Sequence, residues 1–256
     1  MASPRISVIM PAFNRERYVA ESMRSVLAQS FKGFELIVVD DGSTDRTLEI
    51  AREIAATDPR VRIESNSKNL GIARTRNKAL GVAQAEYVAL LDSDDIWVDR
   101  DKLAKQAAFL DAHPDHALVG GAIRHIDPDG KALRVAVFPE SDASIRKIIL
   151  RFNPFAQSTL MYRKDAILEA GGYSPAYQVC DDYALWLAVG KKYKFANFGD
   201  IFTGYRIHGS NITRTKRLTA AREIFEIVRA NSAAYPRPWI GIAKAYVRLV
   251  VAFFRT

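Results

Sequence analysis

The stretch Leu90-Leu91-Asp92-Ser93-Asp94-Asp95 decides how this chain is interpreted. It ends an apolar run that begins at Tyr87 and is typical of a buried strand, and its three carboxylates follow within four residues. In an open α/β sheet, ligands bind beyond the carboxyl ends of the strands. Asp92 and Asp94 are hard oxygen ligands suited to Mg²⁺ or Mn²⁺, which can also hold a diphosphate. An acidic turn that caps the following helix is the alternative, and the surrounding sequence has to decide between the two.

The composition describes a chain of 256 residues, 48% of them hydrophobic, which is enough for one large domain or two small ones. One Cys and four His exclude a disulfide framework and a Cys-rich zinc site. The first residues lack the pattern of a signal peptide, so we expect a cytoplasmic protein.

The net charge of +8 favours anionic partners, namely nucleotide sugars, phospholipid surfaces or nucleic acid. Basic residues are spread thinly apart from residues 214–217, and no zinc-finger or RNA-binding signature accompanies them. We therefore rank nucleic acid last and expect no such partner. A charge excess without a specific partner is the alternative.

Strand and helix patterns alternate in the first half of the chain. Strands are predicted at 6–10, 36–39, 61–64 and 87–91, and helices at 15–28, 44–56 and 71–83. Asn14 is placed to cap the first helix. Short connections between such elements indicate a mainly parallel, Rossmann-like sheet with helices on both faces. This architecture is typical of a nucleotide-binding half.

The second half mixes both kinds of pattern. Helices are expected at 102–112, 145–152, 164–170 and 181–189, and strands at 118–126, 133–138 and 158–162. Asp127-Pro128-Asp129-Gly130 predicts a hairpin turn, and Gly171-Gly172 is placed to end a helix. Without a repeat or a flexible linker, the two halves are expected to form one body.

The tail predicts a helix at 219–234 and a second at 239–254 after the Pro236-x-Pro238 break. The second helix is apolar around most of its circumference, with Lys244 and Arg248 on one side. It is short for a membrane span and fits an interfacial helix with basic residues at headgroup level. A helix packed on the body or on a second subunit is the alternative.

Four motifs, in this order and spacing, resemble glycosyltransferase family 2: Pro11-Ala12-Phe13-Asn14, Asp40-Asp41-Gly42-Ser43-Thr44-Asp45, Asn69-x-Gly71 through Arg76-Asn77, and Leu91-Asp92-Ser93-Asp94-Asp95. The similarity is strong from residue 5 to about 112. Three later stretches resemble looser motifs of the family's acceptor half: Gly171-Gly172-Tyr173, Asp181-Asp182-Tyr183-x-Leu185-Trp186 and Tyr205-Arg206-x-His208.

The resemblance implies a GT-A fold, here a mixed, mainly parallel sheet flanked by helices and followed by a C-terminal helical tail. It implies a donor-binding half at 1–115 and an acceptor-binding half at 116–215, with the C-terminal helices at 216–256. It also implies a nucleotide-diphosphate sugar donor, a divalent metal (Mn²⁺ or Mg²⁺) and inversion at the anomeric carbon.

The residues that the resemblance implies for donor binding are Pro11, Ala12, Phe13, Asn14, Asp41, Arg76, Asp92 and Ser93. Asp41 would accept a hydrogen bond from the base, since a buried carboxylate left unpaired is costly. Arg76, or Arg74 in its place, would approach the donor, and an exposed arginine on a helix face is an equal alternative. Asp92 would meet the ribose or the water shell of the metal.

Metal binding is implied for Asp94, with Asp92 and His208 as further candidates. Asp95 is expected to cap the next helix or to support the site. For His208, the motif match indicates a lid over the diphosphate or a third metal ligand, and a histidine packed for structural reasons is the alternative.

The general base in the family is the Asp of a Glu-Asp pair that opens a helix, and the corresponding pair here is Asp181-Asp182. The resemblance therefore implies that Asp182 is the base and that Asp181 supports it or contacts the acceptor. The departure from Glu at Asp181 bears on acceptor contacts. Two carboxylates at a helix start are also ordinary capping residues. We interpret Cys180 as a small buried residue rather than a nucleophile.

The resulting hypothesis is an inverting, metal-dependent, hexosyltransferase-like enzyme. It would move a sugar from a UDP-sugar to a saccharide or lipid-linked acceptor in cell-surface polysaccharide or glycoconjugate synthesis, at the inner face of the membrane. A sugar-phosphate nucleotidyltransferase is one alternative, which should show a glycine-rich basic loop where this chain has Pro11-Ala12-Phe13-Asn14. A non-catalytic nucleotide-sugar-binding protein is the other. The oligomeric state is left open.

Overall fold

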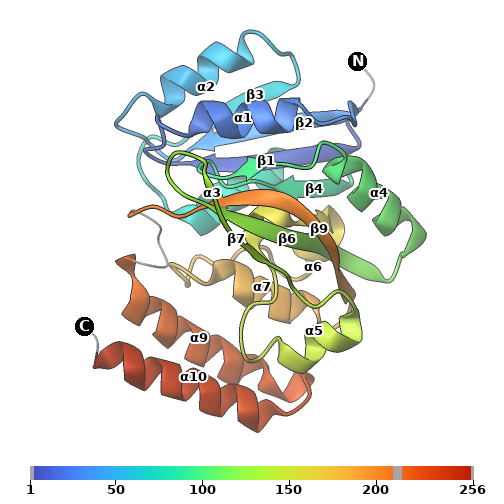
Figure 1. The fold of residues 1–256 in the computed structure, drawn as a ribbon, viewed down its shortest axis with the longest axis vertical. Coiled ribbons are helices and arrows are strands. Elements are labelled where there is room, and N and C mark those ends of the chain that lie inside the picture. The colour runs from blue at the N-terminus through green and yellow to red at the C-terminus, as the bar shows by residue number, and fades with distance from the viewer. Residues whose placement is uncertain (1–2, 210–214, 255–256) are drawn as a thin grey trace.

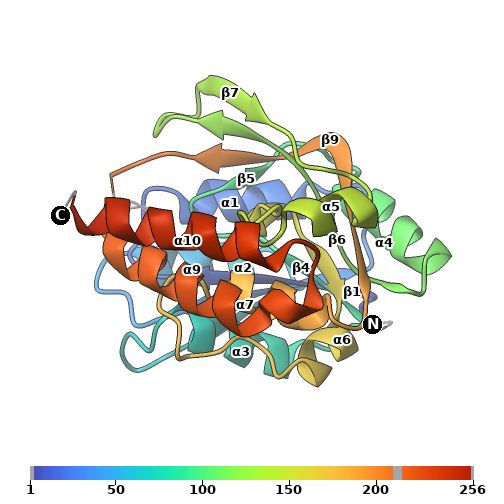
Figure 2. The same ribbon diagram turned by 90° about the horizontal axis from the view of Figure 1, so that it is seen from below.

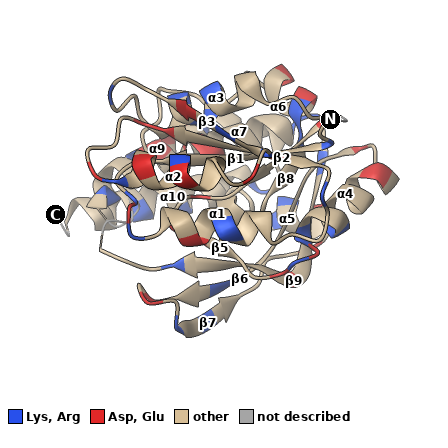
Figure 3. Ribbon diagram, turned by 90° about the horizontal axis from the view of Figure 1, so that it is seen from above, with Lys and Arg blue, Asp and Glu red and all other residues tan. Residues whose placement is uncertain are grey.

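A computed structural model describes residues 3–209 and 215–254 of the chain. One curled sheet forms the centre, helices cover its faces, and two long helices lie side by side at one end (Figures 1 and 2). Arg214, in the predicted basic cluster, and Arg255, directly after the predicted tail helix, lie outside the described residues. In the described part, Lys and Arg are spread over many elements rather than gathered in one patch on the face that Figure 3 shows.

The first half alternates strands with helices. In chain order its elements are β1 (Ile6–Ala12), α1 (Val19–Leu27), β2 (Phe34–Asp40), α2 (Thr47–Ala55), β3 (Val61–Ser65), α3 (Ile72–Val82) and β4 (Tyr87–Leu90). β1 pairs in parallel with β2 and β4, and β2 pairs in parallel with β3. All residues of β1, β2 and β4 are buried because apolar layers cover both faces of the sheet.

The second half extends the same sheet. Its elements are β5 (Ile96–Trp97), α4 (Lys102–Ala112), β6 (His116–Ile126), β7 (Ala132–Ala136), α5 (Asp142–Ile148), a 3₁₀ turn (Gln157–Thr159), β8 (Met161–Arg163), α6 (Lys164–Glu169), α7 (Asp181–Val189) and β9 (Lys194–Arg206). The strand order is β3-β2-β1-β4-β8-β6-β9-β5, with β7 on β6. β8 runs antiparallel to β4 and β6, so the sheet is mixed and joins the two halves into one layer.

The core lies on both sides of this sheet, and alternate residues of each strand enter opposite layers. Along β1, Val8 and Met10 belong to the layer under α1 and α4, whereas Ile9 belongs to the layer that contains Trp186 of α7. This packing fixes the register of β1, and it therefore fixes where the polar residues beyond its carboxyl end emerge.

The C-terminal tail forms α9 (Arg217–Asn231), a short 3₁₀ turn (Ser232–Ala234) and α10 (Pro238–Phe253). α9 packs its buried Ile227 and Val228 on the layer that contains Trp186. Among residues 3–209 and 215–254, no helix is both long and apolar enough to cross a bilayer.

The helices α4 and α7 have the predicted bounds, and the predicted hairpin turn joins β6 to β7, with Gly130 at a φ of 86°. Other local predictions are wrong. Asn14 does not cap a helix, because α1 begins at Val19 with Tyr18 as its N-cap. Instead Asn14 adopts a left-handed conformation (φ 51°). A short polar side chain tolerates this conformation.

The remaining corrections concern element ends and missed strands. Residues 157–159 are a 3₁₀ turn rather than the start of a strand, and α5 begins three residues earlier than predicted, at Asp142, because Ser141 caps it. β9 is absent from the prediction because the exposed pair Gly199 and Asp200 interrupts its buried pattern. The two-residue strand β5 was also missed, since its pairing with β9 is the only contact that defines it as a strand.

Candidate active site

A cavity of about 860 Å³ opens beyond the carboxyl ends of β1, β2 and β4. Ten of the predicted site residues line it: Pro11, Ala12, Phe13, Asp41, Arg76, Asp92, Ser93, Asp94, Asp181 and Asp182. Asp94 from the loop after β4 and Asp182 from the first turn of α7 therefore share one cavity. Acidic groups that are almost ninety residues apart in the chain come together as the sequence predicts.

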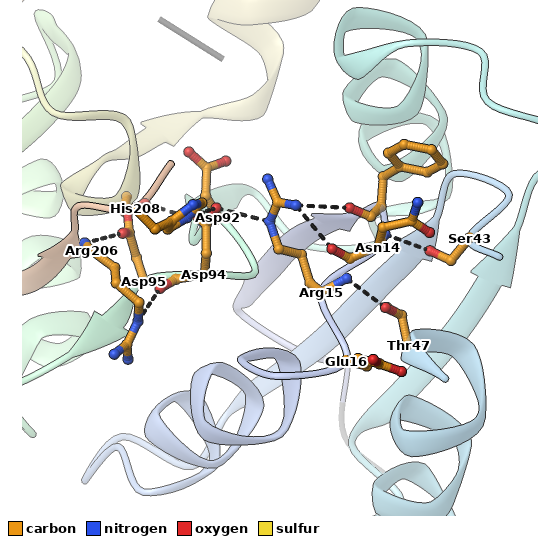
Figure 4. A network of polar contacts seen from close by, with 12 residues as sticks. Asn14, Arg15, Glu16, Ser43, Thr47, Asp92, Asp94, Asp95, Arg206 and His208 are labelled. Atoms are coloured by element: carbon orange, nitrogen blue, oxygen red, sulfur yellow. Dashed lines mark hydrogen bonds and ion pairs between the residues drawn. The ribbon is translucent and has the colours of Figure 1, made fainter. Parts of the chain in front are cut away.

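Asp94 lies between two cationic or potentially cationic side chains (Figure 4). Its Oδ2 is 2.9 Å from Nε of Arg15 and 3.0 Å from Nε2 of His208. Burial by itself raises the pKa of Asp94, but the hydrogen bond with His208 and the charge of Arg15 bring this pKa below its ordinary value. Asp94 is therefore held in its anionic form.

His208 is buried and stacks on the ring of Tyr18, with 5.4 Å between the centroids. Of the three residues predicted to bind the metal, His208 and Asp94 are in contact with each other. Asp92 is held elsewhere, by Arg76. Within the described part of the chain, His, Cys, Asp and Glu side chains do not form a group of three or more that could hold a metal ion.

The carboxylate of Asp94 is a ligand type that suits Mg²⁺ or Mn²⁺, and its Oδ2 already contacts Arg15 and His208. Mg²⁺ is commonly bound by one or two carboxylates, with substrate phosphates and water completing its coordination. A cation between Asp94 and a diphosphate in the cavity would need no third protein ligand.

Arg76 connects the two sides of the cavity. Its Nη2 donates to Oδ1 of Asp92 at 3.1 Å, and its Nη1 donates to Oδ2 of Asp181 at 3.1 Å. The side chain is buried and lies over the ring of Tyr173. Burial lowers the pKa of Arg76, but Asp181 and Asp92 outweigh burial and raise it. The alternative of an exposed arginine on a helix face is wrong for Arg76; Arg74 is exposed, and it also lines the cavity.

Asp182 is positioned by contacts that differ from those of Asp181. Its Oδ2 accepts a hydrogen bond from Nδ2 of Asn153 at 3.1 Å, and its Oδ1 accepts one from the backbone N–H of Tyr183 at 2.7 Å. Burial, followed by the charge of Asp181, raises the pKa of Asp182 to about 7. A carboxylate with this pKa can accept a proton near neutral pH.

Asp41 is buried and organises the loop before α3. Its Oδ1 accepts hydrogen bonds from Nδ2 of Asn66 (2.8 Å) and the N–H of Leu70 (2.9 Å), and its Oδ2 accepts one from the N–H of Gly71 (2.9 Å). Gly71 takes a φ of 90°, which glycine adopts without strain. A nucleobase in the cavity would therefore meet the carboxylate of Asp41 in an orientation that three hydrogen-bond donors already fix.

Three of the predicted residues, Asn14, Asp95 and His208, are not among the residues that line the cavity. The side chain of Asn14 accepts a hydrogen bond from the N–H of Thr44 at 2.9 Å and so ties the loop after β1 to the loop after β2. Asp95 does not cap α4, which begins at Lys102, but supports the site. Its carboxylate accepts hydrogen bonds from Oγ of Ser158 (2.5 Å) and from the N–H of Arg206 (2.8 Å) (Figure 4).

Sequence reasoning missed the residue that holds the loop before α7 in place. Glu223 of α9 is buried and accepts hydrogen bonds from three consecutive backbone N–H groups, those of Gln178 (2.7 Å), Val179 (3.0 Å) and Cys180 (2.9 Å). Gln178 and Val179 line the cavity directly before α7. No local pattern reveals this contact because its partners are more than forty residues apart.

Cys180 is buried, as predicted. Burial, followed by the charges of Asp182 and Glu223, raises the pKa of its thiol. The thiolate that nucleophilic chemistry needs is therefore disfavoured.

Solved structures with the same architecture define the fold. The chain matches S. aureus TarS 1-349 in complex with UDP-GlcNAc with a TM-score of 0.72 and 22% identity, over 98% of this chain and 72% of that one. It matches the mannosyltransferase PcManGT from Pyrobaculum calidifontis, in complex with GDP-Man and Mn²⁺, with a TM-score of 0.69 and 19% identity, over 100% of this chain and 77% of that one. The fold is the GT-A fold of glycosyltransferases.

Sequence comparison identifies the family within this class. Residues 7–169 match the family model of glycosyl transferase family 2. The chain is 35% identical to the putative glycosyltransferase EpsE of Bacillus subtilis, over 80% of this chain and 71% of that protein. It is 29% identical to the UDP-Glc:alpha-D-GlcNAc-diphosphoundecaprenol beta-1,3-glucosyltransferase WfaP of Escherichia coli, over 97% of this chain and 91% of that protein. The chain belongs to glycosyl transferase family 2, and the predicted family and fold class are confirmed.

Proposed function

We propose that this glycosyltransferase moves a sugar from a UDP-sugar to a lipid-linked or saccharide acceptor with inversion at the anomeric carbon. The observation that carries the proposal is the shared cavity, with anionic Asp94 on one side and Asp182, poised to take a proton, on the other. The names of relatives narrow the substrates. WfaP is named for a UDP-Glc donor and a diphosphoundecaprenol-linked acceptor, and TarS was solved with UDP-GlcNAc.

The donor side is proposed to bind the nucleotide diphosphate. Pro11, Ala12 and Phe13 would contact the base and ribose, and Asp41 would accept a hydrogen bond from the base. Asp94 and His208 would hold the divalent cation, Mn²⁺ or Mg²⁺, which when bound neutralises the charge of the diphosphate leaving group.

The acceptor side is proposed to supply the base. Asp182 would take the proton from the acceptor hydroxyl as that oxygen attacks the anomeric carbon. Asn153 holds the carboxylate of Asp182 in one orientation, and Arg76 holds the neighbouring Asp181. Attack from the face opposite the leaving group needs a single base and inverts the configuration.

Product analysis tests the reaction class. The full chain is incubated with a panel of nucleotide sugars and acceptors in Mn²⁺ or Mg²⁺, and release of nucleoside diphosphate is measured. We expect metal-dependent release from a UDP-sugar. Pyrophosphate formed from a nucleoside triphosphate would establish a nucleotidyltransferase instead, and binding without turnover across the panel would leave a nucleotide-sugar-binding protein.

Substitution of Asp182 tests the assignment of the base. Asp182→Asn should keep donor binding and reduce transfer by about 10²–10⁴-fold, the usual contribution of a general base. The matched control is Asp165→Asn, an exposed carboxylate in the first turn of α6, which should transfer at the normal rate. Normal turnover of Asp182→Asn would remove this residue from the mechanism.

A further inference from the structure

One side of α10 presents large apolar side chains to solvent. We call this surface the α10 outer face, and its members are Trp239, Tyr246, Val247, Val250, Val251, Phe253 and Phe254. Trp239 is 70% exposed, Val247 59% and Phe254 80%. Tyr246, Val250 and Phe253 recur at helical spacing, and Trp239 lies seven residues before Tyr246, so these side chains form one continuous stripe.

The opposite side of α10 holds the helix on the body through small residues. Gly241 and Ala245 are buried, and a Cβ at Gly241 would meet Cβ of Leu150 at 2.6 Å. A helix that only packs on its own domain buries its large apolar residues and exposes polar ones. α10 instead buries small residues and exposes large apolar ones. Packing on the body therefore accounts for Gly241 and Ala245, but it does not explain the large side chains of the outer face.

The charged residues of α10 itself have a single sign. No Asp or Glu follows Glu226, whereas Arg237, Lys244 and Arg248 lie in or directly before the helix. At its C-terminal end, Arg222 of α9 borders a hollow of about 370 Å³ together with Phe253 and Phe254. A second copy of the chain docked through the same face would bring these cations together, which is unfavourable. An anionic surface would complement them.

We propose that α10 docks on an anionic phospholipid surface, with its axis in the plane of the interface and its outer face below the headgroups. A 16-residue helix with an apolar face and a basic border fits this mode of binding. Lipid headgroups would then meet Lys244 and Arg222, while Trp239 and Phe254 enter the acyl boundary.

The tail also connects this surface to the acceptor side of the cavity. Lys216, directly before α9, lines the cavity, and its Nζ donates to Oε1 of Gln178 at 3.1 Å. Glu223 holds the same loop. Docking through α10 would therefore bring the acceptor side towards the lipid layer that carries a lipid-linked acceptor; this consequence rests on the proposed function, whereas the docking itself does not.

Vesicle co-sedimentation of the full chain tests the docking. The probes are phosphatidylcholine vesicles with and without phosphatidylglycerol. Binding should require the anionic lipid and weaken with added salt. Trp239→Glu and Val247→Glu should each weaken it about tenfold or more, because each places a charge where apolar surface would be buried. The matched control is Val137→Glu, which alters a 70% exposed valine just after β7 and should bind as the parent does.

The charge contribution is measured separately. Arg222→Gln and Lys244→Gln should each weaken binding to the anionic vesicles about fivefold, the usual effect of one cation near such a surface. Equal binding of the parent and Val247→Glu, or no binding to either vesicle, would overturn the proposal. A dimer in solution that Val247→Glu converts to monomer would also overturn it, in favour of a second copy as the occupant.

Nucleoside diphosphate release in solution, measured on the same preparations, separates this proposal from the proposed function. Val247→Glu should release diphosphate at the parent's rate. Vesicle binding without any donor turnover would contradict the proposed function and support the docking. Donor turnover without vesicle binding would support the proposed function and contradict the docking.

Discussion

The donor side and the acceptor side of the cavity are held by different kinds of contact. On the donor side, Asp41 and Asp94 follow β2 and β4, whose parallel pairing with β1 brings their carboxyl ends to one edge. On the acceptor side, Asp181 is held by Arg76 from 105 residues away, and Asp182 by Asn153 from 29 residues away. Sheet geometry places the first set, with Arg15 and His208 in contact with Asp94, whereas the second set depends on a few long-range polar contacts. Single substitutions should therefore disturb the acceptor side more.

The largest difference between the two sides should appear in the pH dependence of transfer. Asp182, with a pKa of about 7, loses its capacity as a base when it is protonated, whereas Asp94 stays ionised because its pKa is below the ordinary value. Below about pH 7, kcat/KM for the acceptor should fall about tenfold per pH unit. Donor affinity, measured by calorimetry at the same pH values, should change less. If donor affinity fell as steeply with pH as kcat/KM for the acceptor, the two sides would not differ in their pH dependence.

Removal of Arg76 should cause the largest loss of stability. Arg76→Met would leave Asp92 and Asp181 without their shared cation, and breaking a buried ion pair in this way costs about 3–5 kcal/mol. Urea unfolding would measure the loss. Arg74→Met is the matched control, because Arg74 is exposed on the same helix and should change stability by less than about 0.5 kcal/mol. Similar unfolding midpoints for the two variants would show that Arg76 does not hold the two sides together.

Glu223 should matter next, and mainly for the acceptor. Glu223→Gln replaces one carboxylate oxygen with an amide that cannot accept from the N–H groups of the 178–180 loop, a loss of about 1.5–3 kcal/mol for hydrogen bonds to a charged group. Because this loop lines the cavity, KM for the acceptor should rise more than KM for the donor. Glu226→Gln, exposed on the same helix, should leave both values unchanged. Equal rises for donor and acceptor would indicate a general loss of folding instead.

Asp182 should also make stability depend on pH. Its pKa is about 7 in the folded protein, against about 3.9 for an ordinary Asp in an unfolded chain. Between these values the folded protein retains a proton that the unfolded chain has released, so the contribution of Asp182 to stability falls as the pH rises. Urea midpoints at about pH 5 and pH 7 should therefore differ less in Asp182→Asn than in the parent. An unchanged difference would assign this pH dependence to other groups.

The same contrast explains what could be predicted from the sequence. Asp92 and Asp94 could be found because they follow a strand whose apolar run is visible locally, whereas the Asp181-Asp182 pair was found through its resemblance to a motif of the family. Glu223 could not be found, because an isolated carboxylate on an amphipathic helix gives no sign of the three N–H groups that it meets more than forty residues away. β9 was missed for a related reason, since its pairing with β6 rather than its own period stabilises it. The residues of the donor side could thus be predicted in detail, whereas on the acceptor side only the Asp181-Asp182 motif could be predicted.

The smallest effect should come from Asn14, a local contact of the donor side. Asn14→Ala removes the hydrogen bond to the N–H of Thr44 and leaves a residue with a Cβ at a φ of 51°, which together should cost about 1 kcal/mol. Asn14→Gly loses the same hydrogen bond but relieves the conformational strain, so it should be the more stable variant in urea unfolding. Because parallel pairing still places Asp41 and Asp94, both variants should bind the donor almost normally. If Asn14→Ala destabilised the protein as much as Glu223→Gln and weakened donor binding, the donor side would depend on single contacts as the acceptor side does.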